Sequence, residues 1–161
     1  MKNQINFKIH GVVPFLMHSE RSVNPFEPLV KQMKSITSKR KKTDEDLIEV
    51  ARLEFLLSLY HNGDRYYIPA VNIFATGREA AKQLKLGTAW KQAVIVDNDA
   101  TFEFKHKNKS PNDLWELIEY RDVRSVGVNG SKVMRTRPIF NNWSSDFIPV
   151  NSRRRNRNVN G

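Results

Sequence analysis

The Asn129-Gly130 dipeptide constrains the fold of this chain more than any other short motif in it. It is flanked by Arg121–Val128 and Lys132–Phe140, two runs that both carry β-branched residues. An Asn-Gly pair between such runs is typical of a β-hairpin, because both residues tolerate positive φ angles at little cost. We therefore predict that the two runs pair as antiparallel strands.

Periodic patterns elsewhere predict a mixture of strands and helices. Residues 4–12 alternate between polar and apolar side chains, which predicts a strand. Thr43 precedes three acidic residues and an apolar stripe, so a helix is expected to begin there, because Thr caps free amides and acids suit the positive end of the helix dipole. We expect this helix to stop at Asn62-Gly63.

The middle of the chain predicts a second helix and a second hairpin. The helix should run from Ala70 to about Leu86 and end at Gly87. Residues 93–96 and 101–104 flank the polar turn Asp97–Ala100, which is typical of a hairpin. This order of elements predicts an α+β fold, a mainly antiparallel sheet with two main helices on one face, in one domain over residues 1–150.

Several features of the composition limit the class of protein. Residues 151–161 hold four arginines and one apolar side chain, and we expect this tail to be disordered. The chain has no cysteine, which excludes disulfides, a thiolate nucleophile and a Cys-based zinc site. It also has no apolar run long enough for a membrane span and no apolar block of a signal peptide at its start. We expect a cytoplasmic protein that does not bind membranes.

The formal net charge of +10 is unevenly distributed along the chain. Residues 1–42 have a net charge of +7, residues 43–104 of −4, and residues 105–161 of +7. If the two basic ends meet in space, they form one positive face, as expected of a protein that binds a phosphate backbone. The sequence therefore favours nucleic acid as the partner; the alternative is that the positive charge serves only to keep the protein soluble.

Two groups of cations are candidate nucleic-acid contacts. Lys39, Arg40, Lys41 and Lys42 form a segment with no apolar residue, for which we predict a solvated loop able to neutralise phosphates. Arg135 and Arg137 are two residues apart, so on a strand they share a face, and their guanidinium groups suit phosphates or stacked bases. Arg121 and Arg124 are expected on the neighbouring strand; cross-strand salt bridges to Asp122 or Glu119 are the alternative role for these arginines.

Aromatic side chains are candidates for stacking on bases. For each of them, packing in the core is the alternative. The residues considered are Tyr66, Tyr67, Phe140 and Trp143, of which we select Trp143 as a site residue.

Enzymatic signatures are scarce. There is no glycine-rich phosphate loop, and the four histidines are too far apart in sequence to show metal-ligand spacing. Asp97 and Asp99 fit a turn better than a cation site. His18 is the one candidate catalyst: with Tyr60 or Lys31 as a second proton donor it would suit RNA cleavage without a metal. A histidine that packs and hydrogen-bonds to backbone is the alternative, so we assign no catalytic residue, metal or cofactor.

Three patches resemble a family of uncharacterised phage and prophage proteins. They are Ile9–His18, Ile36–Asp44, and Val133–Phe140 with Trp143, and the resemblance covers roughly residues 5–150. It implies a ferredoxin- or RRM-like layout, distantly similar to the RAMP proteins of CRISPR complexes, whose sheets hold RNA. Members of the family continue with a helix and a Gly-Asp-Trp-rich segment where this chain has its arginine-rich tail, so we expect their closing strand to be missing here.

These observations lead to one expected function and two alternatives. We expect a phage protein that holds single-stranded DNA or RNA without catalysis, through a basic face, in the cytoplasm of the host cell; self-association is left open. The first alternative is a metal-independent RNA endonuclease of RAMP type that uses His18. The second is a phage inhibitor or interaction protein whose basic face binds an acidic host protein.

Overall fold

The computed structural model describes residues 3–128, 130–146 and 150–152. They divide into two compact units, each assembled from distant segments of the chain. The first, here called the α3 unit, comprises Met1–His10, Arg65–Glu103 and Ser144–Gly161; the second, the hairpin unit, comprises Gly11–Asp64 and Phe104–Trp143. The expectation of one domain over residues 1–150 stays a prediction.

The hairpin unit contains the long antiparallel hairpin that the Asn129-Gly130 motif predicts. The whole of strand β7 (Arg121–Val128) pairs with residues 131–138 of β8 (Ser131–Phe140), with Val128 opposite Ser131. Gly130 has a φ of 81°, the left-handed conformation that such a turn requires. The short strand β3 (Phe15–Leu16) pairs with the other edge of β8.

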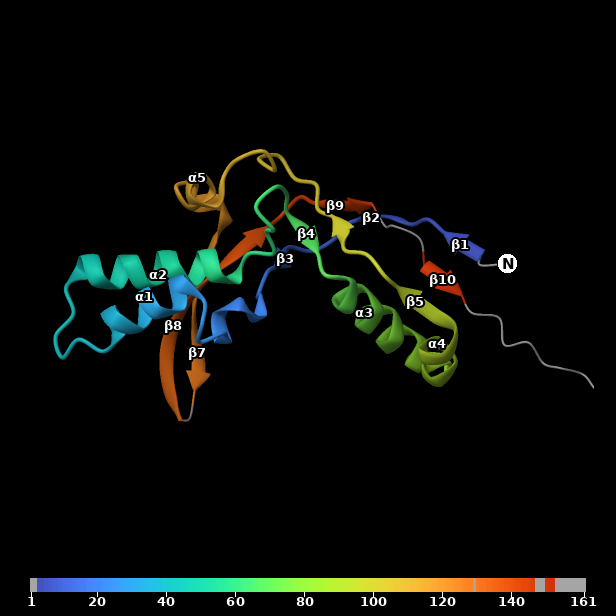
Figure 1. Cartoon of the computed structure of the whole chain (residues 1–161), viewed down its shortest axis with the longest axis horizontal. Coiled ribbons are helices and arrows are strands. Elements are labelled where there is room, and N and C mark those ends of the chain that lie inside the picture. Colours follow the sequence, from blue (N-terminus) through green and yellow to red (C-terminus); the bar gives the residue numbers. More distant parts are fainter. Residues whose placement is uncertain (1–2, 129, 147–149, 153–161) are drawn as a thin grey trace, which may run out of the picture. The chain divides into compact units, whose positions relative to one another are not determined.

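Helices cover this sheet and close its core. Helix α2 (Asp44–Ser58) packs against β8, and α1 (Pro28–Thr37) packs against α2 (Figure 1). The short elements η1 (Glu20–Val23), α5 (Pro111–Trp115) and η2 (Ile118–Tyr120) complete the unit. Its fully buried side chains are Met17, Leu53, Phe55, Leu57, Leu59, Leu114, Pro138 and Phe140.

Helix α2 begins where the sequence predicts and ends earlier. Thr43 and Asp46 form a capping box, in which each side chain accepts a hydrogen bond from the backbone N–H of the other at 3.2 Å. The predicted end at Asn62-Gly63 is wrong, because α2 stops at Ser58. The carbonyl of Ser58 accepts a hydrogen bond from the Ser19 N–H at 3.0 Å, which ties the chain to the segment after β3.

The α3 unit consists of small sheets and two helices. Strand β10 (Val150–Ser152) lies between β1 (Asn3–Ile5) and β5 (Val94–Val96), β2 (Lys8–His10) pairs with β9 (Ser144–Asp146), and β4 (Tyr67–Ile68) pairs with β6 (Ala100–Thr101), all antiparallel. Asn151 and Ser152 thus form part of a strand although they fall within the predicted tail; residues 153–161 lie outside the described part of the chain. The strand predicted over residues 4–12 is interrupted between β1 and β2.

The second hairpin prediction is wrong. Strand β5 pairs with β10 and β6 pairs with β4, so the strands on either side of the Asp97–Ala100 turn do not pair with each other. Instead, the Asp99 carboxylate accepts a hydrogen bond from the Ala70 N–H at 2.8 Å. The turn is therefore directed at the start of helix α3 (Ala70–Gln83), whose N-cap residue Pro69 has no side-chain acceptor.

The predicted end of the second helix is also wrong. Helix α3 ends at Gln83, and Gly87 begins a further helix, α4 (Gly87–Ala93). The chain reverses at Lys85, which has a φ of 59°, while the N–H of Leu86 donates to the carbonyl of Ala81 at 2.8 Å. This is a Schellman-type end with Lys in the position that glycine normally occupies. The sequence therefore lacks the glycine that would have marked the reversal.

The overall class is α+β, with five α-helices and antiparallel sheets in the described part of the chain. The expected single sheet is not present there: the strands form four separate sheets, and the two main helices, α2 and α3, belong to different units. Most strands have only two or three residues, too few to extend one continuous sheet. None of the helices described combines the length and the apolar character needed to cross a bilayer.

Candidate nucleic-acid interface

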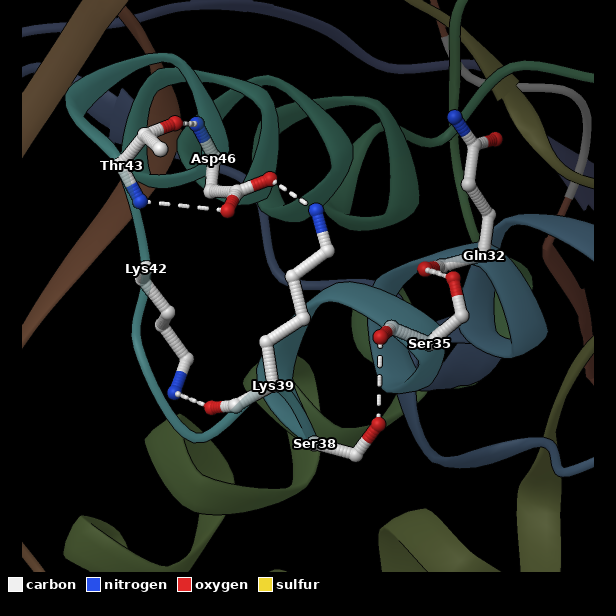
Figure 2. Close-up of polar contacts among 7 residues, drawn as sticks. All are labelled: Gln32, Ser35, Ser38, Lys39, Lys42, Thr43 and Asp46. Atoms are coloured by element: carbon white, nitrogen blue, oxygen red, sulfur yellow. Dashed lines mark hydrogen bonds and ion pairs between the residues drawn. The ribbon is translucent and has the colours of Figure 1, made fainter.

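The predicted basic loop connects α1 to α2, and all four of its cations are exposed. Two of them bind within the protein, as Figure 2 shows. The Lys39 ammonium donates to Asp46 Oδ1 at 2.6 Å, and the Lys42 ammonium donates to the Lys39 carbonyl at 3.1 Å. The hydrogen bond from Lys39, followed by that from the Thr43 N–H, lowers the pKa of the Asp46 carboxyl.

The other two cations of the loop differ from Lys39 and Lys42 in their side-chain contacts. For Arg40 and Lys41 the structure shows no hydrogen bond or ion pair of the side chain with any residue it describes. These two side chains are the ones that phosphates can neutralise without displacing an internal partner.

Arg135 is held by an acid that is distant in the sequence and was not among its expected partners. Its guanidinium donates to Oε1 of Glu54 on α2 at 2.5 Å, while Oε2 of the same carboxylate accepts from the Thr136 N–H at 3.0 Å. The Glu54 side chain is 12% exposed and that of Arg135 is 43% exposed, so this pair joins the helix to the sheet with its carboxylate largely buried and its guanidinium partly solvated. The signal for this pair in the sequence is Glu54 itself, a single acidic residue on the apolar stripe of a predicted helix.

Arg124 and Arg121 also have internal partners. Arg124 donates to Asp122 at 2.5 Å, but this pair lies along β7 and is therefore not the cross-strand salt bridge that was considered. The Arg121 guanidinium lies 4.0 Å from the centre of the Trp115 ring, and its Nε donates to the Trp115 carbonyl. Glu119, the other acid considered, lies 3.6 Å from His106.

Arg137 differs from these arginines. On β8, Thr136, Pro138 and Phe140 are buried, while Arg135 and Arg137 are half-buried, so the two arginines share the other face as predicted. The structure shows no hydrogen bond or ion pair between the Arg137 side chain and the residues it describes. Among the four arginines selected on β7 and β8, Arg137 is the one whose fork is available in the described structure.

Arg137 lines a pocket of about 430 Å³ within the hairpin unit. His18, Ser22 and Arg135 are among its polar lining residues, and Met33, Leu57 and Val126 are among its apolar ones. The pocket thus combines guanidinium groups with apolar wall, which suits a ligand that has both an anionic and a flat apolar part.

His18 reports the electrostatics of this pocket. Desolvation of the ring lowers the pKa of His18, and the positive charges of Arg137 and then Arg135 lower it further. The His18 imidazole is therefore neutral near pH 7. Tyr60, considered as its proton-donating partner, donates its hydroxyl to the backbone carbonyl of His18 at 2.9 Å.

The aromatic residues fit the packing alternative better than base stacking. The Trp143 indole N–H donates to the Val13 carbonyl at 3.0 Å, and its ring packs edge-on against Phe15. A Cβ atom at Gly11 would lie 2.0 Å from this indole, so the ring occupies the space that a side chain would need. Phe140 and Tyr66 are buried in the cores of their units, and Tyr67 is half-buried.

Neither a metal site nor a known relative adds to this description. Within residues 3–128, 130–146 and 150–152, no group of three or more His, Asp or Glu side chains is placed to hold a metal ion. Comparisons of the chain with protein-family models, with curated proteins and with solved structures each gave no match.

Proposed function

We propose that this protein holds single-stranded DNA or RNA without catalysis, through the pocket of Arg137 and the basic loop of the hairpin unit. The observation that carries the proposal is the Arg137 guanidinium, which lines a concave site and has no acidic partner within the described structure. Desolvation is the main cause of the lowered pKa of His18, and the charges of Arg137 and Arg135 in the same pocket lower it further.

The chemistry of the pocket fits a nucleotide unit. A guanidinium fork binds two phosphate oxygens at once, and these charge-assisted hydrogen bonds are the strong class. A volume of about 430 Å³ falls in the range of ligand pockets, and the half-buried apolar side chains of Met33 and Val126 offer a surface to a base. Bases are free to enter such a pocket only when they are unstacked, which favours single strands over duplexes.

The basic loop extends the contact without requiring a fixed geometry. Arg40 and Lys41 are exposed on the segment between α1 and α2, so they can follow a flexible nucleic-acid backbone. Their contribution is the release of counterions from phosphates, which does not depend on base sequence.

Cleavage of RNA is the second candidate, and one observation favours it. His18 is neutral near pH 7 and shares its pocket with two arginines, an arrangement that can accept a proton and stabilise a pentacoordinate phosphate. Against this, Tyr60 directs its hydroxyl to the His18 backbone, and Glu54, which also lines the pocket, is bound to Arg135. Binding without cleavage is therefore the function we propose. A phage or prophage origin, a RAMP-like layout and a cytoplasmic location remain part of the same proposal.

Binding is tested by fluorescence anisotropy with a labelled single-stranded oligonucleotide. The logarithm of the affinity should fall linearly with the logarithm of salt concentration, and a duplex of the same sequence should bind more weakly. Arg137→Ser should weaken binding, whereas Arg78→Ser, which removes the same charge from α3, should not. An affinity that ignores salt between about 50 and 200 mM, or equal losses in the two variants, contradicts the proposal.

Catalysis is tested by incubating the protein with mixed RNA in EDTA. The RNA should remain intact, and His18→Ala should bind the oligonucleotide as the parent does. Cleavage by the parent that His18→Ala abolishes would establish the endonuclease instead.

A further inference from the structure

An apolar groove lies between α3 and α4 in the α3 unit. Its volume is about 490 Å³, and its walls are formed by alanine, leucine, valine and tryptophan side chains with one glycine. Leu84 and Leu86, which line it, are 72% and 53% exposed. Neither α3 nor α4 contains a buried residue. Two contacting helices that leave apolar side chains exposed in a groove between them are typical of a surface that binds a partner.

The groove is a built feature of the unit and not a loose crossing of two helices. A Cβ atom at Gly77 would lie 2.2 Å from the Trp90 ring, so the ring rests directly on the α3 backbone and forms the floor of the groove. The Trp90 indole N–H is buried without a hydrogen-bond partner in the described structure. A buried donor without an acceptor is destabilising, and a smaller apolar residue would avoid this cost.

The charges that accompany the groove are mostly positive. Residues 70–93 carry four cations and one acid, Glu79, which pairs with Arg78 at 2.9 Å and with Lys82 at 2.8 Å. Lys85 and Lys91 adjoin the lining residues Leu84, Leu86 and Trp90 in sequence, are exposed, and form no side-chain hydrogen bond or ion pair with a described residue. The groove is thus an apolar surface whose lining residues have, as sequence neighbours, two exposed cations that lack partners among the described residues.

We propose that the α3–α4 groove binds an acidic amphipathic helix of a partner protein. Such a helix presents apolar side chains at i, i+3, i+4 and i+7 to the groove and carboxylates to Lys85 and Lys91. Charge and hydration favour this occupant over two others, a second copy of the groove and a nucleic acid. Two copies of the groove would bring cations against cations, and a nucleic acid would lose the hydration of its phosphates against apolar walls. The inference is independent of the proposed function, because it concerns residues of the other unit.

The test uses a synthetic peptide and the full-length protein labelled with ¹⁵N. The peptide has about 18 residues, enough for a helix of about 27 Å, with leucines on one face and glutamates beside them. A matched peptide has lysine in place of every glutamate. The acidic peptide should bind saturably and shift the Trp90 indole N–H signal, which Trp90→Phe identifies by its loss, whereas the lysine peptide should not.

Variants of exposed residues distinguish binding in the groove from nonspecific hydrophobic binding elsewhere on the surface. Leu84→Ser with Leu86→Ser should weaken the affinity for the acidic peptide at least about tenfold. Leu47→Ser on α2 is the matched control, since Leu47 is 55% exposed and lies outside the groove, and it should leave the affinity unchanged. Lys85→Glu with Lys91→Glu should weaken the acidic peptide and admit the lysine peptide.

Three outcomes would overturn the proposal. The first is equal binding of the two peptides or no binding of either, and the second is an equal loss in the Leu47→Ser control. The third is self-association in sedimentation velocity that Leu84→Ser with Leu86→Ser abolishes, which would make a second copy the occupant. Oligonucleotide binding measured on the same variants should not change, so failure here is distinct from failure of the proposed function.

Discussion

Two carboxylates of α2 do the same chemical task in two regions of the hairpin unit. Asp46 accepts hydrogen bonds from the Lys39 ammonium and the Thr43 N–H, and Glu54 accepts them from the Arg135 guanidinium and the Thr136 N–H. Their side chains are almost equally buried, 13% and 12% exposed. They differ in reach: the partners of Asp46 lie seven and three residues away in sequence, whereas those of Glu54 lie 81 and 82 residues away.

A cation in the sequence is therefore not the same as a cation available to a ligand. In each region an acid of α2 binds one cation, and within the described residues another cation has no such partner: Arg40 and Lys41 in the loop, and Arg137 on β8. The local pair shapes the start of a helix, and the long-range pair fastens the helix to the sheet. Removing each should therefore affect stability and binding differently.

The largest expected effect is on stability. Glu54→Ala leaves the Arg135 charge unpaired, and it also removes the acceptor of the backbone N–H of Thr136, a buried residue. We therefore expect a loss of about 2–4 kcal/mol in the free energy of unfolding. Asp46→Ala removes half of an exposed capping box and should cost less. Urea unfolding followed by circular dichroism measures both, and equal losses would show that the long-range pair is worth no more than the local one.

The next effect is on binding by the sheet arginines. Arg137→Lys keeps the charge and removes the fork, so oligonucleotide binding should weaken by about 1–3 kcal/mol with an unchanged salt slope and an unchanged melting temperature. Arg135→Lys should instead lower the melting temperature, because its fork is bound to Glu54. If the two variants lose the same affinity at unchanged stability, Arg135 contacts the ligand as well.

A smaller effect is expected in the basic loop. Arg40→Ser with Lys41→Ser should reduce the salt slope on single strands by up to about 0.7 for each phosphate that the loop no longer neutralises. Lys39→Ser with Lys42→Ser removes the same charge from cations that already have internal partners, so its slope should change less. Anisotropy titrations at several salt concentrations compare the two, and the reverse order would mean that the internal hydrogen bonds open on binding.

The smallest effect is on the titration of His18. Because the pKa of His18 is lowered in the folded protein, the unfolded chain binds this proton more tightly, and stability is lost as pH falls through the ordinary value of 6.5. Arg137→Ser removes one source of positive potential and should raise the pKa of His18 toward that value. An NMR titration of the imidazole signals measures it, and a pKa that does not respond would place the Arg137 charge away from the ring.

What the sequence determined by itself is local. The Asn129-Gly130 hairpin, the Thr43 cap and the exposed loop of Lys39–Lys42 are present as predicted. Each depends on hydrogen bonds or solvation within a few residues, so the residues that decide it stand next to one another in the chain. The shared face of Arg135 and Arg137 follows in the same way from the two-residue period of a strand.

Only the tertiary structure decided which distant segments meet. Asp97–Ala100, which follows strand β5, has the residues of a good turn, yet β5 pairs with β10 and Asp99 accepts a hydrogen bond from the Ala70 N–H of α3. Glu54 likewise pairs with Arg135 from β8 rather than with a cation near it in the sequence, since burial makes an unpaired charge costly and a distant partner that removes this cost is preferred. Such choices depend on competition between partners across the whole fold, and no short stretch of sequence contains that competition.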